Sequence, residues 1–126
     1  MKALRAAILV LVLLMAASLV NSAYLTARCG HWTAQLDTVT AAASGGDWDT
    51  AAREMAALRA DWQKKQSYLH ITLMHEEINE TDTLLHQCAL FVDAQDNGSL
   101  SDAAVQLALQ FDRLAEMEQL SIKNVL

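Results

Sequence analysis

The sequence predicts an all-α protein in which an N-terminal transmembrane helix continues into a small antiparallel four-helix bundle. The chain of 126 residues contains no proline and only four glycines, so the residues that tight turns between strands require are scarce. Its apolar residues recur at alternating steps of three and four, which is the spacing of one face of an α-helix. The length suits a single small domain after a membrane segment.

The membrane segment is expected in residues 1–25. Lys2 and Arg5 precede a stretch, residues 6–20, that carries no charge and has only Ser18 as a polar interruption. Extended through Leu25, this helix reaches about 30 Å, the thickness of a hydrocarbon core. The two N-terminal cations favour a cytoplasmic N-terminus. We therefore expect a single-pass protein of the cell membrane whose C-terminal domain, residues 26–126, is extracytoplasmic.

The same segment has an alternative interpretation as a cleaved signal peptide. The small residues of 16–18 and 21–23 both resemble cleavage sites, in which case a secreted helical domain would remain. Residues 24–39 favour the uncleaved anchor, because they keep a helical composition with no polar spacer after the apolar stretch.

Four amphipathic helices are expected beyond the anchor, each with one apolar stripe facing the others. The first helix should end at residues 43–46, with Asp47 capping the second, and a bend is expected at residues 71–72. The third should stop at residues 96–98, and Ser99 with Asp102 resembles a capping box that opens the fourth. The stripes are Leu25, Cys29, Trp32, Leu36 and Val39; Trp48, Ala51, Met55, Leu58 and Trp62; Met74, Ile78, Thr81, Leu85, Cys88 and Val92; and Leu100, Ala104, Leu107, Phe111 and Leu114.

The charge of the chain argues against nucleic acid as a partner. The formal net charge is −6, and residues 26–126 contain 15 acidic residues and only 7 basic ones. Binding to phosphates needs a clustered cationic face. The largest basic cluster, Arg59 with Lys64 and Lys65, is what a solvated helix face would show.

Cysteine and histidine offer a disulfide more readily than a metal site. Cys29 and Cys88 both fall on inward stripes of a domain expected outside the cytoplasm, so a disulfide between them is a candidate. The alternative is that both are small core residues. No metal site or cofactor is predicted, because His31 and His86 each stand two residues from a cysteine, and such pairs point to different sides of a helix.

The candidate functional surface is a polar stripe on the expected third helix, opposite its apolar face. It consists of His75, Asn79, Asp82 and His86, with Glu76 and Glu80 at its edges. We expect it to serve as an interaction face or to remain as solvated surface. No activated nucleophile, Gly-rich phosphate loop or HExxH pair occurs, so the protein is not expected to be an enzyme.

The pattern as a whole resembles a family of short bacterial membrane-anchored proteins, domain of unknown function 4363. The resemblance rests on the N-terminal span, the tryptophans Trp32, Trp48 and Trp62, the stripe from Ile78 to Val92, and the terminal segment of residues 120–126. The family carries no assigned activity, so the resemblance implies an architecture and leaves the function open.

Together these features predict a membrane-anchored, non-enzymatic scaffold or protein-interaction module of the bacterial cell envelope. Its partners would be the membrane, through residues 1–25, and an unidentified envelope protein. The alternatives are an extracytoplasmic ligand or metal sensor and a secreted helical domain. The sequence leaves the oligomeric state open.

Overall fold

A computed structural model describes the backbone of residues 1–72 and 75–125, and the side chains of residues 1–66, 75–117 and 120. These residues form four helices and no strand, which confirms the predicted fold class. The helices are α1 (Lys2–Ser44), α2 (Trp48–Thr72), α3 (His75–Asp93) and α4 (Asn97–Val125).

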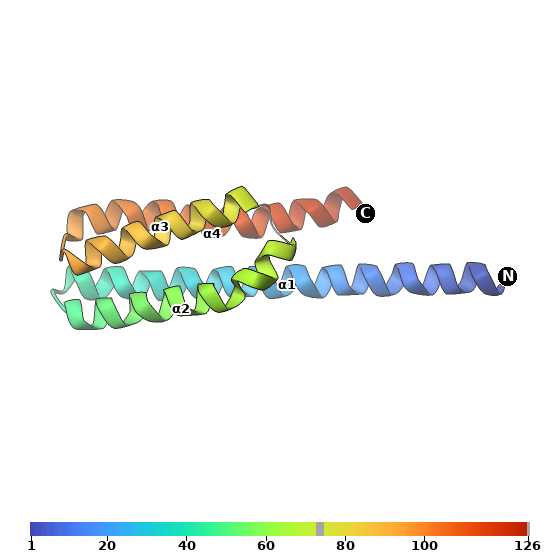
Figure 1. Cartoon of the computed structure of the whole chain (residues 1–126), viewed down its shortest axis with the longest axis horizontal. Coiled ribbons are helices and arrows are strands. Elements are labelled where there is room, and N and C mark those ends of the chain that lie inside the picture. The colour runs from blue at the N-terminus through green and yellow to red at the C-terminus, as the bar shows by residue number, and fades with distance from the viewer. Residues whose placement is uncertain (73–74, 126) are drawn as a thin grey trace.

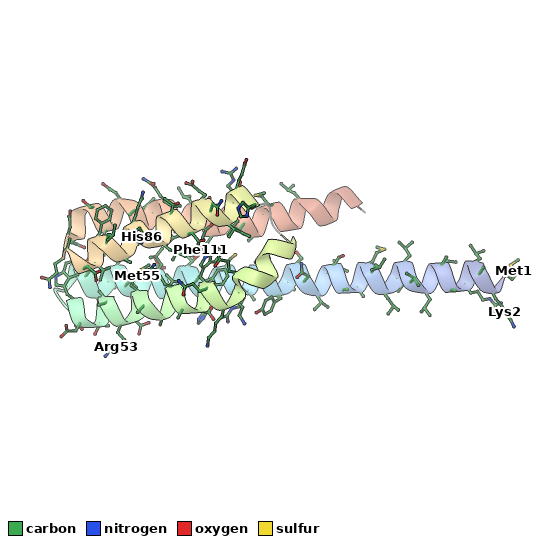
Figure 2. The ribbon with its side chains drawn as sticks, viewed as in Figure 1. Met1, Lys2, Arg53, Met55, His86 and Phe111 are labelled. Atoms are coloured by element: carbon green, nitrogen blue, oxygen red, sulfur yellow. The ribbon has the colours of Figure 1, made fainter. Side chains whose placement is uncertain are left out.

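Helix α1 has two parts with different surroundings. Its N-terminal part projects from the bundle as a lone helix, as Figure 1 shows, and its side chains stand free in Figure 2. This part is long and apolar enough to cross a membrane, and none of its apolar window is buried against the rest of the chain. The packed part of α1 begins near Ser22 and Leu25.

The four helices are arranged around one core. Helix α1 packs against α2 and α4, and α3 packs against the same two helices, so α1 and α3 lie diagonally opposite each other. The α1–α2 and α3–α4 turns lie at the end of the bundle far from the N-terminus (Figure 1). The end of α2 and the start of α3 lie at the opposite end, from which the N-terminal part of α1 projects (Figure 1).

The predicted stripes fill this core. Every member of the four stripes is buried apart from Trp48, which is partly buried, and Met74, which lies outside the described residues. At the centre, the Trp32 and Trp62 rings meet edge to face with their centroids 5.2 Å apart. Phe111 lies 5.5 Å from Trp32 and 6.4 Å from Trp62 between ring centroids. One aromatic cluster therefore joins α1, α2 and α4.

The first turn forms as predicted. Helix α1 ends at Ser44, and Gly46 takes a φ of +79°, which glycine adopts without the steric cost of a side chain. The Asp47 carboxylate then accepts hydrogen bonds from the Thr50 amide, at 3.2 Å, and the Thr50 hydroxyl, at 2.7 Å. Asp47 is thus the N-cap of α2, which runs on to Thr72.

The second turn differs from the prediction in its register. Helix α3 ends earlier, at Asp93, and the residue with positive φ is Gln95, at 54°, rather than Gly98. Helix α4 begins at Asn97, so Ser99 is not its cap. The Asp96 carboxylate fills that role, because it accepts the Ser99 amide at 3.1 Å. Aspartate at residue 96 is as good a cap as serine at residue 99, and the tertiary structure decides between them.

Candidate functional site

Two of the four predicted face residues line a groove between α2 and α3. The groove, of about 260 Å³, is bounded on α3 by Asp82, Leu85 and His86. The other two predicted residues, His75 and Asn79, are exposed nearer the start of α3. The His86 side chain is exposed at the groove. The structure thus separates the predicted stripe into a groove and an exposed segment.

Asp82 belongs to the packing of the bundle as much as to its surface. Its carboxylate is half-buried and accepts the indole N–H of Trp62 at 2.5 Å and the side-chain amide of Gln66 at 2.7 Å. A buried tryptophan needs an acceptor for its single N–H donor, and Asp82 supplies one across the helix pair. The position is therefore less open to a partner than the sequence suggested.

The α2 side of this groove was not among the predicted site residues. It is formed by polar side chains at helical spacing and the edge of one core ring: Arg59, Trp62, Gln63 and Gln66. Arg59, Gln63 and Gln66 step by four and three along α2, which is the available sequence signal. That these side chains share a groove with Asp82 depends on how α2 is rotated against α3, which the spacing alone does not give.

Asp61 repeats the same arrangement between α1 and α2. It forms an ion pair with Arg28 and accepts the indole N–H of Trp32 at 2.6 Å. Partial burial on its own would raise the pKa of this carboxyl. The hydrogen bonds from Trp32 and Arg28 and the charges of Arg28 and Lys65 outweigh it, so the pKa of Asp61 is lowered.

Replacing Asp61 with asparagine is expected to lower the free energy of unfolding by about 1–2 kcal/mol at pH 7. Because the pKa is lower in the folded protein than in the unfolded chain, this stabilisation is complete above about pH 5 and is lost as the pH falls through the folded pKa. Urea unfolding at pH 7 and pH 3 measures the effect. The difference between the two proteins should be smaller at pH 3 than at pH 7, and a constant difference would contradict the assignment.

A third carboxylate links α3 to α4. Gln110, which is almost fully buried on α4, donates to the Glu77 carboxylate at 2.9 Å and to the Thr81 hydroxyl at 3.3 Å. Arg113 pairs with the other Glu77 oxygen at 3.1 Å. Among the described residues, three of the four neighbouring helix pairs are thus joined by a carboxylate that satisfies a buried donor on the adjacent helix.

Both cysteines are free thiols in the core. Cys29 lies on α1 and Cys88 on α3, which are diagonal helices. Burial, together with the charge of Asp112, raises the pKa of Cys29 to about 12, and burial raises the pKa of Cys88 to about 11. At neutral pH neither is a thiolate, so neither is poised as a nucleophile.

We expect the native protein to resist iodoacetamide at pH 8, because only thiolates react and both are buried. After denaturation without reductant, both cysteines should be alkylated, as found by mass spectrometry. Labelling of the native protein would contradict the burial of the thiols. Failure to label the denatured, unreduced protein would instead establish the disulfide.

No metal centre is formed within the described residues. There, no three side chains of the histidine, cysteine, aspartate and glutamate types converge in a way that could hold an ion. The remaining histidine, His70, is not included, because it lies outside the residues whose side chains are described.

Comparison with known proteins places most of the chain in one family. A family model described as a domain of unknown function (DUF4363) matches residues 19–125, which include the end of the apolar segment and nearly all of the bundle. No curated protein and no solved structure matches the chain.

Proposed function

We propose that this protein, which belongs to the DUF4363 family, is a non-enzymatic scaffold or interaction module of the bacterial cell envelope, held at the membrane by α1. In this proposal residues 1–25 span the bilayer and the remaining residues present a polar, acidic helical face to another envelope protein outside the cytoplasm.

The observation that carries the proposal is the continuity of α1. One helix without a break runs from Lys2 to Ser44, a length of about 65 Å. About 30 Å of it suffices for the hydrocarbon core of a membrane, and the rest is a core helix of the bundle. A span joined to the bundle by regular helix fixes the domain close to the membrane surface, unlike a domain on a flexible linker.

The anchoring is tested by expressing the full chain in a bacterial host and adding protease to cells stripped of their wall. We expect the full-length mass in the membrane fraction and digestion of the bundle from outside. A soluble product whose mass begins near Ser18 or Tyr24 would replace the anchored form with the secreted one. Protection from external protease would overturn the proposed orientation.

The exposed part of α3 is the proposed partner surface. Four side chains are exposed along its first turns: His75, Glu76, Asn79 and Glu80. The two glutamates make this surface acidic. Because like charges repel across an interface, a partner would present cationic or neutral donors. Asp82 is excluded from this surface as a test position, since its replacement would also remove the acceptor of Trp62.

Charge reversal at Glu76 and Glu80 tests this surface. The matched control is Asp112→Lys with Glu116→Lys on α4. Both residues are exposed, they have the same i, i+4 spacing, and their replacement changes the net charge equally. We expect E76K/E80K to reduce the recovery of a specific partner from crosslinked, solubilised membranes about tenfold, a loss of about 1.4 kcal/mol, while the control keeps it. Equal recovery in both variants would overturn this surface.

A further inference from the structure

A groove at the end of the bundle from which α1 projects combines apolar side chains with two lysines. It is open, measures about 730 Å³ and lies between α1 and the later part of α2. Its α1 wall is made of Ala16, Ala17, Val20, Asn21 and Tyr24, and its α2 wall includes Lys64 and Lys65. The size is within the range of small-molecule sites, about 300–1,000 Å³.

The α1 wall straddles the expected boundary of the bilayer. From Ala16 to Tyr24 the helix rises about 12 Å. The first residues of this wall belong to the apolar span, and Tyr24 lies where interfacial aromatic side chains sit. The alanines have small side chains, so they leave room beside the helix for a chain that runs parallel to it. The Ala16 end of the groove is therefore lined by apolar side chains that suit a hydrocarbon chain.

The lysines lie at the Tyr24 end of the groove. The Lys65 ammonium lies 5.9 Å from the centre of the Tyr24 ring, within the range of a cation–π contact. This contact places a positive charge at the level of the interfacial tyrosine. Lys64 is exposed beside it. Lysines on long flexible stems at this depth hold their charges among the lipid headgroups.

The charges around the groove favour an anion. No acidic residue precedes Asp37 in the chain, and none occurs between Asp61 and Glu76. Asp61, the nearest carboxylate on α2, forms an ion pair with Arg28 and also interacts with the charge of Lys65, so one carboxylate stands against three cations on this face. Of the other acidic residues at this end, Glu76 and Glu77 belong to α3, which lies diagonal to α1, and Glu116 belongs to α4, which lies diagonal to α2. The α1–α2 face is thus locally cationic although the whole chain is acidic.

We propose that this groove binds one anionic glycerophospholipid, with an acyl chain along Ala16, Ala17 and Val20 and its phosphate between Lys64 and Lys65. The assignment rests on the proposed membrane anchoring, because only an inserted α1 brings the groove to a headgroup. The bound lipid extends the contact between the bundle and the membrane surface and so fixes the tilt of the bundle over it.

The test is a titration of the full-length protein in neutral detergent with phosphatidylglycerol or phosphatidylcholine, followed by native mass spectrometry. A lysine near an anionic lipid surface contributes roughly 5-fold in affinity, so we expect phosphatidylglycerol to bind roughly 20- to 30-fold more tightly than phosphatidylcholine. K64Q/K65Q should remove this preference. R53Q/R113Q, which removes two exposed charges from the bundle outside the groove, should retain it.

Two further measurements separate this site from the anchoring on which it rests. Flotation with vesicles of phosphatidylcholine alone measures insertion without any anionic headgroup, and both the wild type and K64Q/K65Q should float. A wild type that does not float overturns the anchoring and the lipid site together. A protein that floats but binds both lipids equally, or whose bound phosphatidylglycerol is displaced by an equal concentration of inorganic phosphate, overturns the lipid site alone.

Discussion

Replacing Trp32 with alanine is expected to lower the free energy of unfolding by about 3–5 kcal/mol, which is the range for a large aromatic side chain removed from a core. Trp32 is fully buried and contacts both Trp62 and Phe111. Its removal also deprives the Asp61 carboxylate of the indole N–H donor, although the ion pair of Asp61 with Arg28 remains. Because small domains have only about 5–15 kcal/mol in total, the variant should unfold about 10 °C or more below the wild type.

The matched control for this prediction is Trp48→Ala. Trp48 is the same residue type, but it opens α2 and is only partly buried, so its loss should cost about 1–2 kcal/mol. Thermal unfolding followed by circular dichroism, with the full chain in detergent, compares the two variants. Equal losses of stability would contradict the aromatic cluster as the centre of the core. Trp32→Phe, which keeps a ring but removes the N–H donor, should fall between Trp32→Ala and the wild type.

The core could be predicted from the sequence because the helical period is a property of the chain itself. Positions such as Leu25, Cys29 and Trp32 face inward whatever the arrangement of the other helices, and all of them are buried. Trp48 shows the limit of this reasoning. It continues the stripe of α2, but it is the first residue of that helix. It therefore lies at the end of the bundle, where the other helices cover it only partly.

The polar links between helices could not be predicted in the same way, because they depend on how one helix is rotated and shifted against the next. The sequence pattern predicts Asp82 on an exposed face opposite the apolar stripe of α3, but at 3.6 residues per turn it stands only about a quarter turn from that stripe. The structure shows it half-buried against Trp62 and Gln66 of α2. Gln110 was not assigned to the core, yet it is almost fully buried because Glu77 and Thr81 of α3 satisfy its amide. A buried tryptophan or glutamine signals that some acceptor lies nearby, but the sequence does not say which one.

Two arginines in the N-terminal part of α1 are expected to abolish the retention of the protein in membranes. Val12 and Leu13 lie near the middle of the apolar segment and are exposed by 55% and 60% in the isolated chain. An arginine at the centre of a membrane helix costs about 2.5–3.5 kcal/mol, so V12R/L13R should disfavour insertion by about 5–7 kcal/mol. The bundle itself should stay folded, because none of the apolar window packs against it.

The control for this prediction is V105R/L109R on α4. These two residues are apolar and equally exposed, at 61% and 63%, but they lie on the bundle. Extraction of membranes with alkaline carbonate should release V12R/L13R and leave both the control and the wild type in the pellet. If V12R/L13R stayed in the pellet, the bare part of α1 would not be the anchor. If the control were released as well, the exposed apolar residues of α4 would share in membrane binding, and the bundle would lie on the bilayer rather than project from it.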